Sequence, residues 1–307
     1  MKRLVIATRR SRLALWQAEH VKARLLALQP GLAVELLPLS TRGDELLDQR
    51  LDDAGGKGLF IKELESAMGD GRADLAVHSM KDVSADLPPG FTLAAIGERE
   101  DPRDALVSAR FDSFAAMPAG AIVGTSSLRR EAQIAASSPG LQVRLLRGNV
   151  ETRLAKLERG EYDAIVLAVA GLSRLGLEGR IRRKLEAEEI LPAPGQGALG
   201  IECLAARSDL ISFLQKLENP VDAACVRAER TVSRALGGSC TIPLGAYAEH
   251  VSGGRLRLRA LVAAPDGKRI ARADVRGEAK DAEALGARAA QVLREQGAEE
   301  ILASLGR

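Results

Sequence analysis

The sequence has few aromatic residues and little net charge. Aromatic side chains make up only 3% of the 307 residues, which disfavours the base-stacking surfaces of single-strand nucleic-acid binders. The formal net charge of +3 is small for this length and argues against general nucleic-acid binding. No apolar run is long enough to span a bilayer. Arginines at positions 9, 10 and 12 interrupt the first apolar run, so no signal peptide is predicted. We therefore expect a cytoplasmic protein that binds neither nucleic acid nor a membrane.

Cysteine is also scarce. Cys203, Cys225 and Cys240 are the three cysteines of the chain, and none belongs to a CxxC motif. Three cysteines cannot all pair with one another. This pattern predicts a reducing compartment, no disulfide framework and no metal site.

The residues that are abundant are typical of a globular protein. Hydrophobic residues make up 46% of the chain and charged residues 28%, and the length suffices for two or three domains. Only 10 of the 44 basic residues are lysines. Arginine matches the planar geometry of carboxylates and phosphates, but codon bias in a GC-rich genome also raises its number. The positions of the arginines must therefore decide whether they bind a ligand.

Hydrophobic periodicity predicts two successive α/β units. The first unit has expected strands at 4–8, 33–39 and 74–78 and helices at 11–28 and 59–68. The second has expected strands at 121–123, 142–146 and 163–170 and helices at 127–136 and 150–158. Alternation of this kind favours parallel sheets. Segments 98–102 and 191–195 are hinge candidates, and an expected strand at 198–203 would return to the first sheet.

The pattern changes after Asn219-Pro220. A helix is expected at 221–236, strands at 255–259 and 269–275, and a closing helix at 282–296, which together indicate a small α+β domain. The predicted domains are therefore residues 1–98 with 198–216, residues 102–192 and residues 220–307.

A cysteine follows the first helix of this last domain on a short loop. Gly237 and Gly238 end the helix, and Pro243 prevents its return. We expect Cys240 to lie near the surface. From this stretch alone, a buried structural cysteine is the favoured alternative.

Two strand-to-helix junctions combine hydroxyl residues with paired arginines. They are Thr8-Arg9-Arg10-Ser11 and Thr125-Ser126-Ser127-Leu128-Arg129-Arg130. A helix N-terminus offers free N–H groups to anions, and arginine adds charged donors. One such junction is usually a simple helix cap with solvated arginines. Two junctions at equivalent places, with Arg147, Gly148, Arg153 and Arg174 beyond them, predict a cleft for a ligand with several carboxylates.

Asp82 follows the third expected strand at its C-terminal end, where open α/β sheets bind ligands. Its carboxylate could stabilise a cation or transfer a proton, or it could form an ion pair with Lys81. His78 is interpreted as a core residue. Residues 195–200 match GxGxxG, but prolines precede them and a strand follows, so a dinucleotide site is not predicted.

Several motifs together resemble the porphobilinogen deaminase family, also called hydroxymethylbilane synthases. The resemblance runs in order over almost the whole chain, and its motifs are Ile6-Ala7-Thr8-Arg9, Gly55 to Phe60, His78 to Val83, Gly124 to Arg130, Leu146 to Asn149, Pro194 to Gly197 and Gly237 to Cys240. It implies two lobes like those of periplasmic binding proteins around a cleft, and a third domain carrying a cysteine. It also implies a dipyrromethane cofactor, which the enzyme assembles from its own substrate and holds through a thioether.

The implied reaction adds four porphobilinogen units in turn, each with loss of ammonia, and releases hydroxymethylbilane by hydrolysis. Loss of ammonia leaves an azafulvene that is cationic when protonated, and Asp82 matches the family's catalytic aspartate. Cys240 matches the position of the cofactor cysteine. The other residues carried over by resemblance are cofactor-binding Lys81, Thr125, Ser126, Ser127, Arg129, Arg130, Arg147 and Gly148, substrate-binding Arg9, Ser11, Gln17, Arg153 and Arg174, and Lys57 and Phe60 in a loop near the cleft. Asp53 stands where some members have a lysine, so no role is carried over to it.

Two further hypotheses belong to other classes. A two-lobed binding protein for an acidic ligand would need no thiol at Cys240, and a redox enzyme would need a resolving cysteine, which is absent nearby. For the transferase, we expect a monomer. We also expect Arg129→Ala to impair cofactor assembly or chain elongation while leaving the fold intact.

Overall fold

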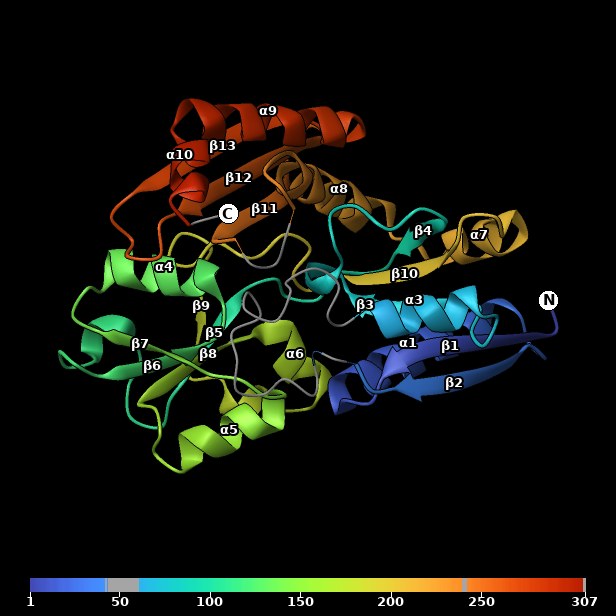
Figure 1. Ribbon diagram of the computed structural model, residues 1–307, viewed down its shortest axis with the longest axis horizontal. Coiled ribbons are helices and arrows are strands. Elements are labelled where there is room, and N and C mark those ends of the chain that lie inside the picture. Colours follow the sequence, from blue (N-terminus) through green and yellow to red (C-terminus); the bar gives the residue numbers. More distant parts are fainter. Residues whose placement is uncertain (42, 44–60, 239–241, 306–307) are drawn as a thin grey trace.

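The computed structural model describes residues 1–41, 43, 61–238 and 242–305. Within these residues the chain forms two five-stranded sheets and one three-stranded sheet. Figure 1 shows the first sheet in blue and cyan with its strand β10 in yellow, the second mainly in green, and the third in orange and red above both. The predicted architecture of two α/β domains and a small α+β domain is confirmed.

The first domain is a mixed sheet in the order β2-β1-β3-β10-β4. Its described elements are β1 (Arg3–Arg9), α1 (Arg12–Leu28), β2 (Ala33–Leu39), α3 (Lys62–Gly69), β3 (Leu75–Ser79), β4 (Phe91–Ile96), β10 (Leu199–Leu204) and α7 (Ser208–Leu214). The expected return of the chain to this sheet is confirmed, because β10 pairs with both β3 and β4. Both pairings are antiparallel, so the prediction of an all-parallel sheet was wrong for this half of the sheet. A strand that comes back from another domain need not run in the direction set by a βαβ crossover.

The second domain repeats this plan in the order β7-β6-β8-β5-β9. Its elements are β5 (Asp104–Val107), β6 (Ile122–Thr125), α4 (Leu128–Ser137), β7 (Gln142–Leu145), α5 (Val150–Glu158), β8 (Ala164–Ala168), α6 (Val169–Arg174) and β9 (Arg183–Leu185). Strand β6 is parallel to β7 and β8, whereas β5 is antiparallel to β8 and β9. The expected strand at 163–170 ends at Ala168, where α6 begins. Periodicity does not separate these two elements because both are buried apolar segments.

The third domain is an antiparallel sheet covered by helices. Its elements are α8 (Pro220–Ala235), β11 (Leu244–Val251), β12 (Arg255–Ala263), β13 (Ile270–Glu278), α9 (Ala282–Glu295) and α10 (Ala298–Ala303). Asn219 caps α8 through its side chain, and Gly237 and Gly238 follow the helix with positive φ angles of 92° and 51°. The predicted end of this helix at two glycines is therefore confirmed. No helix within the described ranges has the length and apolar character that crossing a membrane requires.

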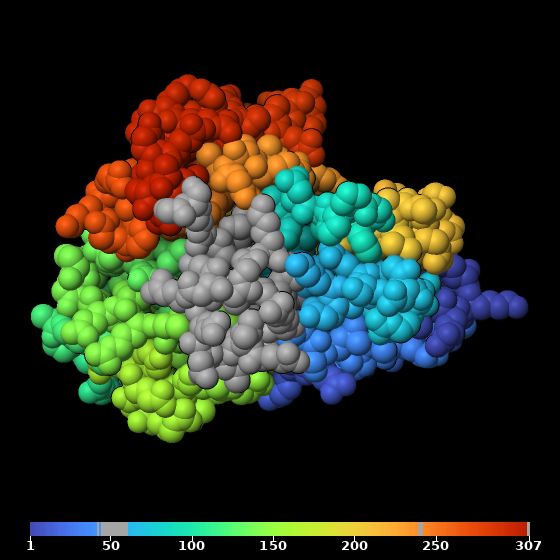
Figure 2. Space-filling model, viewed as in Figure 1, coloured from blue at the N-terminus to red at the C-terminus, as the bar shows by residue number. Residues whose placement is uncertain are grey.

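A buried carboxylate of the third domain ties together the two segments that cross between the sheets. Glu229 of α8 accepts hydrogen bonds from Arg99 Nη1 at 2.6 Å and from the backbone nitrogens of Gly195 and Ala248, each at 2.7 Å. Arg99 lies in the first crossing segment, between β4 and β5, and Gly195 lies in the second crossing segment, between β9 and β10. One carboxylate therefore holds both segments. Figure 2 shows the third domain resting on the other two. The domain boundaries themselves stay a prediction.

Candidate active site

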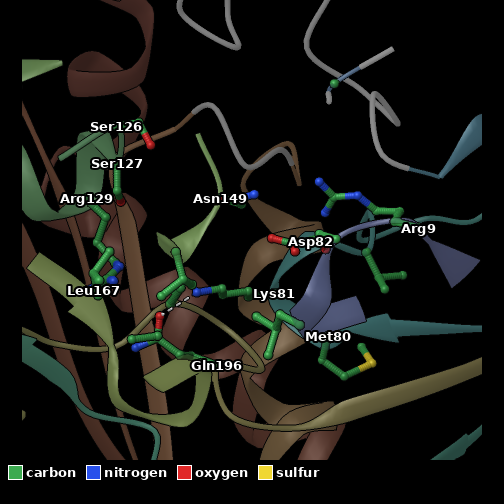
Figure 3. Close-up of a pocket in the computed structure, with 18 of the residues that line it drawn as sticks. Arg9, Met80, Lys81, Asp82, Ser126, Ser127, Arg129, Asn149, Leu167 and Gln196 are labelled. Atoms are coloured by element: carbon green, nitrogen blue, oxygen red, sulfur yellow. Dashed lines mark hydrogen bonds between the residues drawn. The ribbon is translucent and has the colours of Figure 1, made fainter. Parts of the chain in front are cut away.

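A cavity of about 630 Å³ lies where the three domains meet. Side chains from every domain line it, and Figure 3 shows several of them directed toward a common space. The predicted site residues in its wall are Arg9, Ser11, Lys81, Asp82, Ser126, Ser127, Arg129, Arg130, Arg147, Gly148 and Arg153. Eleven of the 14 predicted site residues that the structure describes therefore line the cavity.

The first-domain wall is formed where β3 ends. A single 3-10 turn, η1 (Met80–Asp82), follows Ser79 and is anchored by Met80, which is 1% exposed and donates its backbone N–H to Ala198 O at 3.0 Å. This turn presents Lys81 and Asp82 to the cavity (Figure 3). The predicted position of Asp82 at the C-terminal end of a sheet strand is confirmed.

Lys81 links this turn to the second crossing segment. Its Nζ lies 3.4 Å from Gln196 Oε1. Burial and the nearby Arg130 lower the pKa of the Lys81 ammonium to about 8, although Asp82 and Asp104 oppose the shift. Lys81 is therefore a cation that titrates close to neutral pH unless an anion stabilises its charge.

The second-domain wall holds a buried pair of arginines around one carboxylate. Arg129 Nη2 lies 2.8 Å from Asp104 Oδ2, and Arg130 Nη2 donates to Asp104 Oδ1 at 2.6 Å. Burial alone would raise the pKa of Asp104, but the charges of Arg129 and Arg130 hold that pKa far below its ordinary value. Backbone carbonyls take further arginine N–H groups, at Leu191 for Arg129 and Val166 for Arg130.

The Arg129–Arg130 pair retains N–H groups that no described residue accepts. The Nε atoms of Arg129 and Arg130 are buried without a hydrogen-bond partner among the described residues. Two guanidinium groups share one aspartate, so the group carries a net positive charge. A buried, undersatisfied cation pair of this kind favours an anionic ligand.

The next strand-to-helix turn adds more positive charge. Asn149 caps α5 by accepting from Thr152 N at 2.8 Å, and Arg153, one turn into the helix, donates to Gly148 O at 2.8 Å. Burial, together with the charges of Arg130 and Arg147, lowers the pKa of Arg153 to about 10. Burial is the largest cause of this shift, and the two neighbouring arginines add to it.

Three predicted site residues do not line the cavity. Thr125 is 2% exposed and its hydroxyl accepts from Ser127 N, while Gln17 Nε2 donates to Ser79 Oγ at 2.8 Å. Arg174 Nη2 donates to Gly197 O at 2.5 Å, and its guanidinium lies 5.8 Å from the centre of the Trp16 ring. These three side chains thus bond to other protein groups next to the cavity wall and do not line the cavity.

Three other predicted site residues, Lys57, Phe60 and Cys240, lie outside the described residues, as does Asp53. Gly238 and Ile242, which flank the cysteine loop in the sequence, both line the cavity. The described chain on either side of residues 239–241 therefore reaches the arginine-rich wall.

Sequence reasoning missed three residues that organise the site. Asp104 opens a short buried strand and is 0% exposed. Gln196 donates to Asp104 Oδ1 at 2.9 Å, and Arg230 of α8 donates to the carbonyls of Val83, Ser84 and Ala85. Gln196 lies in a motif that carries the family resemblance, but Asp104 and Arg230 have no local signal because their partners are distant in sequence.

The arrangement is suited to a polyanionic ligand and to a cationic transition state. Lysine and arginine side chains outnumber carboxylates in the cavity wall. Asp82 stands among them with its carboxylate directed into the cavity (Figure 3). A carboxylate in a largely cationic site stabilises positive charge that develops next to it, while the cations neutralise the acid groups of the ligand.

The chain has similarities to solved structures, family models and curated proteins. The chain is similar to a methionine-binding lipoprotein of Bacillus subtilis (13% identity, 70% of this chain and 90% of that chain, TM-score 0.44) and to the periplasmic aliphatic sulphonate binding protein of Escherichia coli (14% identity, 76% and 70%, TM-score 0.41). Two family models match it: the dipyromethane cofactor binding domain of porphobilinogen deaminase over residues 4–212, and the C-terminal domain of that enzyme over residues 223–295.

Full-length relatives carry the same name. Porphobilinogen deaminase of Bordetella parapertussis is 60% identical over 99% of this chain and 97% of its own length. The enzyme of Neisseria meningitidis serogroup B is 57% identical over 99% and 97%. Together, the two family models and these relatives cover nearly the whole sequence. The chain belongs to the porphobilinogen deaminase family.

Proposed function

We propose that this protein joins four porphobilinogen units, each with loss of ammonia, onto a dipyrromethane primer held by Cys240. Hydrolysis then releases hydroxymethylbilane, the linear tetrapyrrole. The observation that carries the proposal is the placement of Asp82 in a cavity walled by arginines from all three domains. The family membership supports the same reaction.

The arginines bind the carboxylates of substrate and primer. Each porphobilinogen carries an acetate and a propionate, so a growing chain accumulates negative charge. Arg129 and Arg130, oriented by Asp104, offer fixed donors, and Arg9, Arg147 and Arg153 extend the positive wall. Lys81 completes it, and bound carboxylates would keep this lysine charged at neutral pH.

Asp82 supports the chemical step. Departure of the amino group leaves a pyrrole that is cationic when protonated, and a nearby carboxylate lowers the energy of that charge. The η1 turn holds Asp82 beside the cation of Lys81, and Arg230 fixes the three carbonyls that follow it. Asp82 can also transfer a proton to the departing amino group and accept the proton that the acceptor pyrrole carbon loses when the new bond forms.

The residues present fit a dipyrromethane group. Arg129 and Arg130 line the cavity of about 630 Å³, and the acid side chains of the group would accept hydrogen bonds from these two guanidinium groups. Ser126, Ser127 and the backbone at Gly148 add polar contacts along the same wall. When bound, the group supplies the acceptor pyrrole for the first condensation.

We propose Cys240 as the attachment point. Its neighbours Gly238 and Ile242 line the cavity, whereas Cys203 and Cys225 are buried free thiols. Burial raises the pKa of Cys203 to about 11 and that of Cys225 to about 12, so neither forms a thiolate readily. Formation of a thioether from porphobilinogen releases ammonia and consumes the thiol proton, so it needs no oxidant.

The remaining expectations complete the proposal. The protein acts as a monomer in the cytoplasm, and its partner is the small molecule porphobilinogen, with no nucleic acid or membrane involved. Thr125, Gln17 and Arg174 act from behind the cavity wall. Lys57 and Phe60 stay candidates for ligand contacts from the loop in which they lie.

The test compares two aspartates close together in sequence. Asp82→Asn is expected to lower kcat by about 10²- to 10⁴-fold, because it removes the carboxylate without changing its size. Asp86, which is exposed and pairs with Arg234 at 2.9 Å, provides the control Asp86→Asn, expected to behave like the wild type. The measurement is the steady-state rate of ammonia release from porphobilinogen, which gives kcat for each variant. Failure of the wild-type protein to release ammonia from porphobilinogen would contradict the proposed function.

A further inference from the structure

Helix α4 carries Arg129 and Arg130 in its first turn, and the third domain packs against this helix. Ala132 of α4 packs in one buried cluster with Leu191 of the second crossing and with Leu261 and Ala263 of β12. All four are at most 5% exposed. The helix that carries the arginine pair therefore packs against the third domain.

The turn between β12 and β13 packs closely against this helix. Gly267 in this turn has a φ of +70°, and a Cβ atom placed there would lie 2.4 Å from Ala136 N and 2.8 Å from Ala132 O. Both are backbone atoms of α4, so they can move away only if the helix moves. Figure 1 shows the orange turn reaching down to α4.

The same face of α4 is hydrogen-bonded to the second crossing segment. Gln133 Nε2 donates to Leu191 O at 3.2 Å and its Oε1 accepts from Leu191 N at 2.8 Å. Arg129 Nη1 donates to the same Leu191 oxygen at 2.6 Å. The crossing segment and the turn at Gly267 thus contact the same face of α4, and a shift of the helix moves the guanidinium groups relative to Asp104.

We propose that Gly267 is a positioning residue for the Arg129–Arg130 pair. The turn that contains it sets how far α4 sits from the third domain, which also carries Cys240. The β12–β13 turn therefore fixes the position of the arginine pair relative to the third domain. The effect on turnover rests on the proposed function, but the effect on the two arginines does not.

A matched glycine provides the control. Gly254, in the turn between β11 and β12, also has a φ of +70°, and a Cβ there would meet no atom within 4 Å. Gly254→Ala and Gly267→Ala therefore share the cost of a side chain in a left-handed conformation. Only Gly267→Ala adds the collision with α4.

The experiment measures how fast phenylglyoxal modifies individual arginines in the full-length protein, located by peptide mass. Arg129 and Arg130 are 3% and 5% exposed, so both should react slowly in the wild type and in Gly254→Ala. In Gly267→Ala we expect them to react at least about tenfold faster, as a change of about 1.4 kcal/mol in local opening would produce. Arg230, 8% exposed and held by the first domain, is the internal reference and should keep its rate.

The outcomes are distinct. Equal rates for Arg129 and Arg130 in both glycine variants, or an equal increase at Arg230, would overturn the proposal, because the latter indicates general loosening. With porphobilinogen, Gly267→Ala should raise KM more than it lowers kcat. If the wild-type protein does not turn over porphobilinogen, the proposed function is wrong. The modification rates of Arg129 and Arg130 would still test the positioning role.

A second pair of variants keeps the test valid if Gly267→Ala does not fold. Leu261→Val removes packing beneath α4, whereas Leu258→Val makes the same change on the same strand in the core shared with α9. Faster modification of Arg129 and Arg130 is expected only for Leu261→Val. The same rates in both valine variants would contradict the proposal.

Discussion

The arginines of the first domain and those of the second reach the same cavity in different ways. Arg9 is half-buried at the end of β1 and Arg10 is exposed, and Ser11 caps α1 by accepting from Ala14 N at 3.3 Å. In the second domain, Arg129 and Arg130 are buried in the first turn of α4 and share Asp104. Strand-to-helix junctions of similar composition thus give one adaptable and one fixed set of cations.

The difference shows what each set can do. Exposed arginines attract anions over a distance, and salt screens them. Buried arginines held by a carboxylate cost desolvation energy but present donors with fixed geometry. We infer that the first-domain arginines adapt to a ligand of changing length, whereas the second-domain pair holds one set of carboxylates in place.

The largest expected effect comes from removing the carboxylate that fixes the second set. Asp104→Asn leaves two buried guanidinium groups without their counter-charge, and we expect the free energy of unfolding to fall by about 3–5 kcal/mol. Asp209, an exposed partner of Arg207, supplies the control Asp209→Asn, which should unfold like the wild type. Urea denaturation measures both, and equal stability of the two variants would show that Asp104 does not fix the pair.

The pH dependence of stability tests the same carboxylate. The native pKa of Asp104 is held below its unfolded value of about 3.9, so its contribution is complete above that pH and is lost as the pH falls below it. Asp104→Asn should therefore lose less stability than the wild type on acidification below pH 4. Parallel losses in both proteins would count against this assignment.

The next effect compares one arginine from each set. Arg129→Ala should lower kcat/KM and also the free energy of unfolding by about 1–3 kcal/mol, because Asp104 loses a partner in the interior. This revises the expectation from sequence that the fold would be unaffected. Arg10→Ala should leave stability unchanged and raise KM, by a factor that shrinks as salt is added. Denaturation and salt-dependent kinetics separate the two, and the same profile for both variants would erase the distinction.

A smaller effect concerns Lys81, which lies between the two sets. With a pKa of about 8 in the free protein, Lys81 loses its charge as the pH rises, so kcat/KM should fall by roughly fivefold to tenfold between pH 7 and pH 9. Stability should move the other way: from about pH 8 to about pH 10.4 the unfolded chain holds this proton and the native chain does not, so stability rises. In Lys81→Arg the charge persists, and the alkaline fall in kcat/KM should disappear. A pH profile unchanged by this substitution would exclude Lys81 as its source.

The smallest expected effect separates the two junction serines. Ser11→Ala removes the cap of α1 and should cost about 1 kcal/mol of stability. Ser127 makes no side-chain cap bond to α4, so Ser127→Ala should leave stability unchanged and raise KM for porphobilinogen. Thermal denaturation and steady-state kinetics of both variants check this, and a stability loss in Ser127→Ala equal to that in Ser11→Ala would contradict it.

Local patterns predicted much of this fold. Ser11, Asn149 and the glycines at 237 and 238 mark helix ends, and the returning strand at 199–204 follows a clear apolar run. The strands β4, β5, β9 and β11 were not predicted. Strands β5 and β9 are only four and three residues long, so their periodicity is weak.

The site was predicted where ligand-binding residues adjoin strands, and was missed where partners come from distant segments. Asp104 binds Arg129 and Gln196 only because β5, α4 and the second crossing converge. Arg174 donates to Gly197 of the second crossing segment, a contact that the sequence did not indicate, and its role in substrate binding stays a prediction. Convergence of this kind depends on tertiary packing, which a single sequence does not reveal.

The most direct measurement is the intact mass of the wild-type protein beside Cys240→Ala, each after incubation with porphobilinogen. We predict a wild-type mass that exceeds the chain by two linked pyrrole units, and a bare chain for Cys240→Ala. That pair of masses would establish the covalent primer at Cys240. Bare chains in both samples would contradict it and would favour a binding protein for an acidic ligand.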